Sequence, residues 1–192
     1  DITQTENLLR LEEELEKVKP YVKYFVNAAG CGINKKIKET DLMDCNRMLE
    51  VNCNALTLLT KIVLPYCGKR SRIVMLASAS AFLPQPGFAV YAASKSYVLS
   101  FSRALRRELK KTGTTVTIVC PGPVDTPFLD TIGGKDSIPV IKRPFIMKTD
   151  KVVSVAIKDA AKGKELSIPG ISMKCFFRIC KIVPHKVLLK FT

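Results

Sequence analysis

The sequence predicts an α/β domain built as a doubly wound parallel sheet with helices on both faces. Segments with a helical repeat of apolar residues alternate with short apolar runs along the chain. Those runs are nearly continuous, as expected for strands that are buried on both faces of a parallel sheet. Three of them end in small or polar residues, "NAAG", "ASAS" and "CPGP". These ends should meet at the carboxyl edge of the sheet, where such folds bind their ligands.

The order of the elements follows from local patterns. The first helix should have an apolar side formed by Leu8, Leu11, Leu15 and Val18. The expected helices are residues 4–18, 42–66, 91–111 and 149–161, and the expected strands are "YVKYFVNAAG", "SRIVMLAS", "TTVTIVC" and "ELSIPG".

The 192 residues suffice for one domain, and their charge is unevenly distributed. The formal net charge is +14. From Lys142 to the end there are 12 Lys and Arg against 3 Asp and Glu. Such a surplus suits a polyanionic ligand, an anionic membrane surface or a solvated basic face. Residues 172–192 form a basic, apolar tail that either lies on a membrane surface or packs on the domain as a terminal helix.

Seven cysteines occur without a CxxC pair, and their number is odd. We therefore expect reduced, buried thiols in a cytoplasmic protein, with neither a disulfide framework nor a metal site. The first residues show no signal-peptide pattern, and no apolar run is long enough to span a bilayer. Peripheral contact with a membrane through the tail stays open.

Tyr91 and Lys95 in "YAASKS" are four residues apart on an expected helix, so they share one face. A free phenol titrates near ~10, and a nearby ammonium lowers that pKa, which suits proton exchange with a carbonyl or alcohol. In a lysine-rich chain, the pair alone is equally consistent with coincidence.

Two further polar residues change that balance. Ser78 ends a strand 13 residues before Tyr91 and offers a hydroxyl to the same substrate oxygen, although a lone serine there would suit a turn. Asn52 lies inside an apolar helix, where its amide needs partners. It either holds a water molecule near the lysine or bends the helix.

Together these residues resemble the short-chain dehydrogenase/reductase family, which has a Ser–Tyr–Lys site, an upstream Asn and a Rossmann sheet. Val26 stands where the family has the first Asn of Asn-Asn-Ala-Gly. The matching motifs, in order, are "DIT", "NAAG", "VN", "ASASAF", "YAASKS" and "PGPVDTPF".

The resemblance implies reversible hydride transfer between NAD or NADP and a ketone, aldehyde or alcohol. Tyr91 would be the general acid or base, and Ser78 would orient the substrate oxygen. Lys95 would lower the pKa of the tyrosine and bind the nicotinamide ribose. Asn52 would support a proton-relay water.

The resemblance also implies the cofactor contacts, with an acidic residue beside the adenine and two residues meeting the carboxamide. No metal is expected, and NAD and NADP are not distinguished. The cofactor-binding residues are expected to be Asp1, Ile2, Asn27, Ala28, Ala29, Gly30, Tyr91, Lys95, Pro121, Gly122, Val124 and Thr126.

One departure from the family pattern is large. Family members begin with a strand and a TGxxxGxG turn that binds the cofactor phosphates, and no such turn occurs here. The match places Asp1 just after the third family strand. We therefore expect residues 1–192 to form the C-terminal two-thirds or more of a single NAD(P)-binding domain. The first three strands would be missing, the first remaining strand would be an open edge, and the fragment alone would be inactive.

The substrate is expected to be hydrophobic, because the segment after the Pro-Gly loop contains "IPVIKRPFIM". Residues 84–109 also resemble the branch with 17-beta-hydroxysteroid dehydrogenases and 3-oxoacyl reductases, which suggests a steroid or fatty-acyl ketone. The family analogy implies a homodimer or homotetramer. Nucleic-acid binding is not expected. The alternatives are a non-catalytic dinucleotide-binding regulatory protein and a basic module that binds membrane surfaces.

Overall fold

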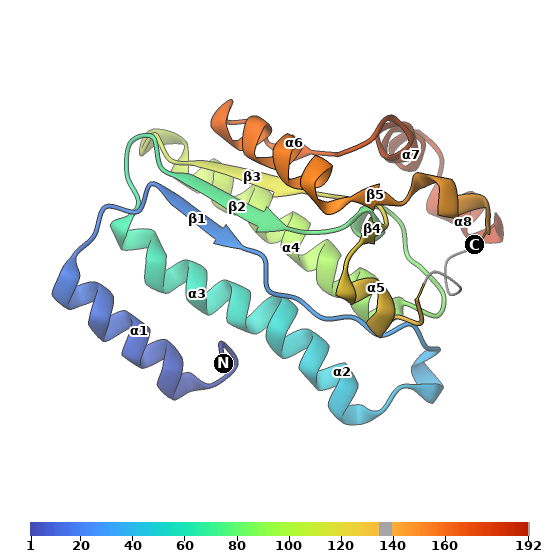
Figure 1. Cartoon of the computed structure of the whole chain (residues 1–192), viewed down its shortest axis with the longest axis horizontal. Helices are drawn as coiled ribbons and strands as arrows, with labels where there is room; N and C mark the ends of the chain where they lie inside the picture. Colours follow the sequence, from blue (N-terminus) through green and yellow to red (C-terminus); the bar gives the residue numbers. More distant parts are fainter. Residues whose placement is uncertain (135–139, 192) are drawn as a thin grey trace.

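A parallel four-stranded sheet forms the centre of the fold, as predicted. Figure 1 shows the computed structural model, which describes residues 1–134 and 140–191. The strand order is β1-β2-β3-β6, and every pairing is parallel. A short parallel pair, β4 and β5, lies apart from this sheet. The strands are β1 (Tyr24–Asn27), β2 (Arg72–Leu76), β3 (Thr115–Val119), β4 (Val124–Asp125), β5 (Met147–Lys148) and β6 (Leu166–Ser167).

Helices alternate with these strands along the chain (Figure 1). The helices are α1 (Thr5–Val18), α2 (Leu42–Leu49), α3 (Leu56–Val63), α4 (Ala89–Glu108), α5 (Pro127–Thr131), α6 (Thr149–Ala161), α7 (Ile171–Ile182) and α8 (His185–Leu188). Short 3-10 segments are Ile37–Glu39, Leu64–Tyr66, Ala79–Phe82, Leu109–Lys111, Val140–Phe145 and Leu189–Phe191.

Both faces of the sheet are covered, which explains the continuous apolar strands. On β2, Ile73 and Met75 belong to a large core that also contains Leu56 of α3 and Val98 of α4. The intervening Val74 faces the other way, in a cluster with residues of α6. Helices α3 and α4 therefore cover one face and α6 the other. Among the described residues β1 pairs only with β2, so its outer edge is open, as expected.

The long helix expected at residues 42–66 is interrupted in its middle. A π-helical turn over Glu50–Ala55 separates α2 from α3, and Asn52 lies within it. One extra residue per turn rotates the following side chains and is often associated with a functional position. The helix is therefore irregular at Asn52, and both roles considered for this residue stay predictions.

Two expectations from the apolar pattern are met only in part. On the apolar side of α1, Leu8 is buried, but Val18 at the end of the helix is 69% exposed. The seven thiols are free, but Cys120 is the one that is buried, and Cys175 is exposed. The other five are half-buried. Apolar neighbours in the sequence therefore predicted the burial of Cys120 correctly, but they predicted too much burial for the other six cysteines.

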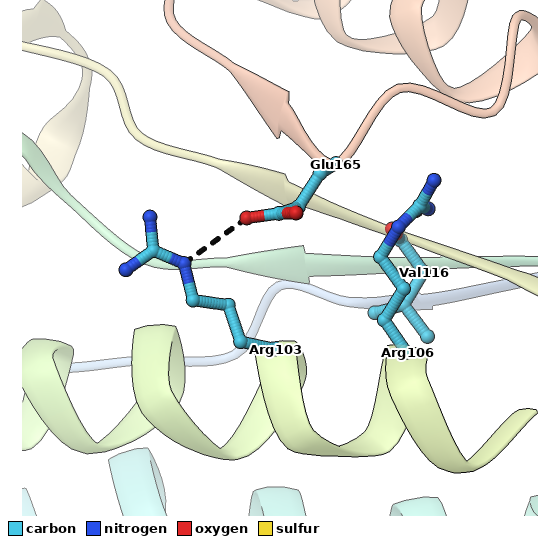
Figure 2. Close-up of polar contacts among 4 residues, drawn as sticks. All are labelled: Arg103, Arg106, Val116 and Glu165. Atoms are coloured by element: carbon cyan, nitrogen blue, oxygen red, sulfur yellow. Dashed lines mark hydrogen bonds and ion pairs between the residues drawn. The ribbon is translucent and has the colours of Figure 1, made fainter.

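Arg106 of α4 links three elements near the amino-terminal end of β3 (Figure 2). Its Nη1 donates to the carbonyl oxygen of Val116 at 2.6 Å, and its Nη2 donates to that of Gly163 at 2.7 Å. The guanidinium therefore fixes α4 to β3 and to the turn after α6. Arg103, one helical turn earlier, forms an exposed ion pair with Glu165 at 3.1 Å.

Candidate active site

The four predicted catalytic residues converge at the carboxyl edge of the sheet. Ser78 follows β2, where its Oγ accepts a hydrogen bond from the backbone N–H of Ser80. Tyr91 and Lys95 lie on successive turns of α4, and both are buried. Asn52 comes from the π-helical turn. Three separate segments thus contribute to one site.

Asn52 connects the loop after β1 to α4. Its Oδ1 accepts from the backbone N–H of Cys31 at 2.9 Å, and its Nδ2 donates to the Cys31 carbonyl at 2.8 Å. The same Nδ2 donates to Ser94 Oγ at 2.9 Å, and that hydroxyl donates to the carbonyl oxygen of Tyr91 at 2.7 Å. The amide is therefore satisfied by the protein, and it fixes the position of the part of α4 that carries Tyr91.

Aromatic rings surround the Tyr91 phenol. The ring centroid of Phe88 lies 4.3 Å from that of Tyr91, and the ring centroid of Phe128 lies 5.6 Å from it. This burial raises the pKa of Tyr91 to about 12, although a hydrogen bond with the Ser78 side chain acts in the opposite direction. The Ser78 and Tyr91 side chains therefore lie close together at the carboxyl edge of the sheet.

Lys95 is buried beside Tyr91, but its effect differs from the expected one. Its Nζ lies 5.7 Å from the centre of the Tyr91 ring and donates to the carbonyl oxygen of Leu76 at 3.0 Å. Burial lowers the pKa of Lys95 to about 8. The expectation that Lys95 brings the tyrosine below its ordinary pKa is wrong for this structure, because loss of hydration on burial has the largest effect on the phenol.

The loop after β1 fits a flat, hydroxyl-rich ligand. Ala28, Ala29 and Gly30 are exposed at the carboxyl end of the strand. A Cβ at Gly30 would lie 3.0 Å from Lys95 Nζ and 3.2 Å from Asn52 Oδ1, so the loop passes directly over the ammonium. Leu76 O is the acceptor that the described residues provide for Nζ, and an ammonium has three donors. Ribose hydroxyl groups are suitable acceptors for the other donors.

Other predicted cofactor contacts lie in different environments. The buried Asn27 side chain donates to the Leu56 carbonyl at 3.2 Å, so it anchors α3 instead of facing outward. The exposed Asp1 accepts from the N–H and hydroxyl of Thr3 within its own turn. Ile2 between them is half-buried. Whether these residues bind a cofactor stays a prediction.

The Pro-Gly loop after β3 lies beside the serine segment. The carbonyl oxygen of Pro121 accepts from the N–H of Ala79 at 2.8 Å. A Cβ at Gly122 would lie 2.6 Å from Met173 Sδ of α7, so only glycine fits there without movement. Val124 begins β4, and Thr126 precedes α5. Residues 135–139, in the segment after the Pro-Gly loop from which the hydrophobic substrate was inferred, lie outside the described residues.

Sequence reasoning missed several residues of this site. Ser94 carries the link from Asn52 to Tyr91, although it stands inside the motif already identified. Its position three residues after Tyr91 on a helix was the available signal. Cys31 lies beside the lysine, and burial raises its thiol pKa while Arg47 and Lys95 lower it. The contact of Phe128 with Tyr91 joins segments far apart in sequence, which no local pattern reveals.

Comparison with known proteins agrees with this site. A sequence model described as short chain dehydrogenase matches residues 1–136. The chain belongs to the short-chain dehydrogenase family. The resemblance drawn from the motifs is confirmed at this level, and the parallel Rossmann-like sheet is that of the family.

The relatives of this family member are named for different reactions. Sulfoacetaldehyde reductase 2 from Chromohalobacter salexigens is 35% identical over 132 residues, 67% of this chain and 52% of the relative. Ketoacyl reductase HetN from Nostoc sp. is 28% identical over 170 residues, 88% of this chain and 58% of the relative. The chain spans about half the length of the curated relatives it matches.

A solved structure confirms the fold of this short-chain dehydrogenase. A short-chain dehydrogenase from Sphingobium yanoikuyae in complex with NADPH superimposes with a TM-score of 0.79 at 23% identity. The match covers 98% of this chain and 73% of that structure. The architecture therefore extends through α7 and α8, beyond the residues that the family model matches.

Proposed function

We propose that the protein catalyses reversible hydride transfer between NAD or NADP and the carbonyl or alcohol group of a hydrophobic small molecule. The observation that carries the proposal is the meeting of Ser78, Tyr91, Lys95 and Asn52 at one edge of the sheet, with the Ser78 and Tyr91 side chains close together. The nicotinamide cofactor, when bound, supplies or accepts the hydride. The side chains supply the proton and hold the reacting groups.

Tyr91 is the proton donor in the direction of reduction. With a pKa of about 12 its phenol is protonated at neutral pH, so it can give a proton to a carbonyl oxygen. Ser78, beside the same hydroxyl, orients that oxygen and stabilises the charge that develops on it. In the direction of oxidation Tyr91 takes the proton from the alcohol.

Lys95 and Asn52 position the reacting groups. The Lys95 ammonium lies under the Gly30 loop, where it would bind the ribose next to the nicotinamide. Asn52 holds the Cys31 backbone and, through Ser94, the first turns of α4. As a proton-relay residue, as the family resemblance implies, it would pass protons to Lys95 through water. The other predicted cofactor contacts are Asp1, Ile2, Asn27, Ala28, Ala29, Pro121, Gly122, Val124 and Thr126.

A steroid or fatty-acyl ketone is the substrate class that we propose. The rings of Phe88 and Phe128 flank Tyr91 and provide apolar surface beside the reacting hydroxyl. A sugar would leave its hydroxyl groups without partners against these rings. The seven free thiols suit a cytoplasmic protein, because this compartment keeps cysteines reduced.

A homodimer or homotetramer formed through α2, α3 and α4 completes the proposal. The exposed apolar side chains on these helices are Leu42, Met43, Leu49, Leu58 and Tyr97. Exposed apolar side chains on these three helices suit an isologous contact between copies. Light scattering after size exclusion should give a dimer or tetramer, and Leu49→Lys should lower the mass to that of the monomer.

The decisive experiment measures oxidation of NADH and NADPH by the protein expressed from its full reading frame. Steroid ketones, 3-oxoacyl thioesters and a ketose sugar serve as substrates. Tyr91→Phe should leave the fold intact and reduce turnover by a factor of ~100 or more, since the proton donor is gone. Tyr97→Phe, on an exposed part of the same helix, is the matched control and should retain turnover.

Two results would contradict the proposal. One is turnover by Tyr91→Phe at the rate of the unchanged protein. The other is tight binding of NADH or NADPH without turnover of any carbonyl substrate, which would favour the non-catalytic regulatory alternative. A preference for the sugar would overturn the substrate class and leave the reaction type intact.

A further inference from the structure

Helix α7 is anchored to the domain by one of its faces. Met173, Phe176, Phe177 and Cys180 recur at helical spacing and pack against the large core. The rings of Phe177 and Phe82 are 4.7 Å apart between centroids. Of the two alternatives for the tail, packing as a terminal helix is therefore correct for this face. The opposite face of α7 therefore points away from the core.

The opposite face combines large apolar side chains that remain exposed. Ile171 is 80% exposed and Ile182 is 82% exposed, at the two ends of α7. Ile179 and, in α8, Val187 are close to half exposed. Bulky apolar residues at such exposure are costly in water unless another surface covers them.

The charges on this segment have a single sign. From residue 166 to the end there is no Asp or Glu. Within the described part of the chain, the segment's Lys and Arg side chains form no ion pair. These exposed residues are Lys174, Arg178, Lys181, Lys186 and Lys190.

The acidic part of the molecule lies elsewhere. Helix α1 carries five Glu against one Arg and one Lys. Figure 1 shows α1 at the lower left and α7 and α8 at the upper right, at opposite ends of the view. An anionic surface would therefore attract α7 and α8 and would repel α1.

We propose that the outer face of α7, together with α8, docks on the surface of an anionic lipid bilayer. The exposed isoleucines would enter the boundary between headgroups and acyl chains, while the lysines and arginine contact the headgroups. No helix within the described ranges has the length and apolar character needed to cross the bilayer.

The same features disfavour other occupants of this face. A second copy would bring an equally basic surface against it, and the like charges would repel. A nucleic acid would pair with the cations but would leave the exposed isoleucines against phosphate and water. An anionic bilayer matches the charged and the apolar parts of the face together.

Docking would place the candidate active site near the lipid. Met173, on the inner face of α7, contacts Gly122 in the Pro-Gly loop, and Phe177 contacts the segment after Ser78. A ketone dissolved in the bilayer would then be close to the site. This consequence rests on the proposed function, whereas docking itself requires neither cofactor nor substrate.

Cosedimentation of the full-length protein with vesicles tests the proposal. Vesicles of phosphatidylcholine alone are compared with vesicles containing one third phosphatidylglycerol, at low and high salt. We expect binding to the anionic vesicles, weakening with salt. The variant Lys174→Glu/Arg178→Glu/Lys181→Glu should lower partitioning about tenfold or more. The variant Ile171→Ser/Ile182→Ser should also lower partitioning, although its net charge is unchanged.

The matched control is Lys35→Glu/Lys36→Glu/Lys38→Glu, which makes the same change in net charge at exposed positions before α2. It should retain most of the binding. Equal loss in both triple variants, equal binding to neutral vesicles, or no sedimentation of the unchanged protein would overturn the proposal. The proposal would also be overturned if the unchanged protein had the mass of a dimer and the α7 variants had the mass of a monomer. Circular dichroism confirms that each variant is folded, and NADPH oxidation is measured separately, so failure of one proposal does not decide the other.

Discussion

Tyr91 and Lys95 lie side by side in α4, with Lys95 Nζ 5.7 Å from the Tyr91 ring centroid. Burial moves their pKa values in opposite directions, to about 12 for the phenol and about 8 for the ammonium. In each case the neutral form is favoured because hydration of the charge is lost. The phenol is therefore a neutral proton donor at pH 7. Burial of the charged Lys95 accounts for most of the resulting loss in folding stability.

Replacing that lysine should stabilise the fold near neutral pH. A pKa lowered from 10.5 to about 8 corresponds to about 3 kcal/mol of unfavourable free energy while the lysine is charged. Loss of the hydrogen bond to Leu76 offsets about 1 kcal/mol of this. We expect Lys95→Met to raise the free energy of unfolding at pH 7 by about 2 kcal/mol, measured by urea denaturation, while activity is lost.

The control is the pH dependence of the difference in stability between Lys95→Met and the unchanged protein. Between pH 8 and 10.5 the unfolded chain holds a proton on Lys95 that the folded chain has released, so stability from this group rises with pH. The advantage of Lys95→Met should therefore shrink across this range. Groups common to both proteins cancel in the difference. An advantage that stays constant from pH 7 to 10 would contradict the assignment.

Asn52→Ala should destabilise the protein by about 2–3 kcal/mol, because buried polar groups lose their partners. The Cys31 N–H and carbonyl and the Ser94 hydroxyl all bond to this fully buried amide. Urea denaturation measures the loss. Asn54→Ala, at an exposed position of the same turn, should cost less than about 0.5 kcal/mol. Similar losses in both variants would show that the turn, and not the amide network, determines stability.

The sheet and the approximate site could be predicted because they depend on local sequence. Buried parallel strands require continuous apolar runs, and their carboxyl ends share one edge, which brought Ser78 and the Gly30 loop together. The π-helical turn at Asn52 escaped prediction, since one added residue barely changes the apolar repeat. The raised pKa of Tyr91 also escaped it, because part of the burial comes from Phe128, which is distant in sequence.

Gly32→Ala should disturb the phenol without changing any polar group. A Cβ at this position would lie 2.7 Å from Tyr91 Cδ2 and 2.9 Å from Phe128 Cζ, so at least one ring must move. Overpacking of this kind costs about 1–3 kcal/mol, and displacement of a catalytic group by ~1 Å lowers turnover roughly 100-fold. Unfolding midpoints and the rate of NADPH oxidation measure the two effects.

Gly68→Ala is the comparison for that variant, because its Cβ would meet Tyr21 at an ordinary 3.4 Å. It should leave turnover unchanged. If Gly32→Ala kept full turnover and stability, the close packing of the Gly32 loop against Tyr91 would be disproved.

Arg103 and Arg106 should differ sharply in their contributions to stability, although they are one helical turn apart (Figure 2). Arg106 donates two hydrogen bonds to the carbonyl oxygens of Val116 and Gly163. Such charge-assisted bonds to backbone groups contribute about 1.5–3 kcal/mol each when the partners are shielded from water. Because Arg106 is half-buried, we expect Arg106→Ala to cost about 2–3 kcal/mol in urea denaturation.

Arg103→Ala should cost less than about 1 kcal/mol, since its ion pair with Glu165 joins side chains that are 40% and 47% exposed. The salt dependence of the stability loss should distinguish Arg103→Ala from Arg106→Ala further. Raising the ionic strength to 1 M should remove the small effect at Arg103, where water and ions reach the pair. The loss at Arg106 should persist, because the acceptors are neutral carbonyls whose bonds depend on geometry. A salt-sensitive loss at Arg106, or equal losses at both positions, would show that attraction to acidic groups and not the backbone contacts governs this part of α4.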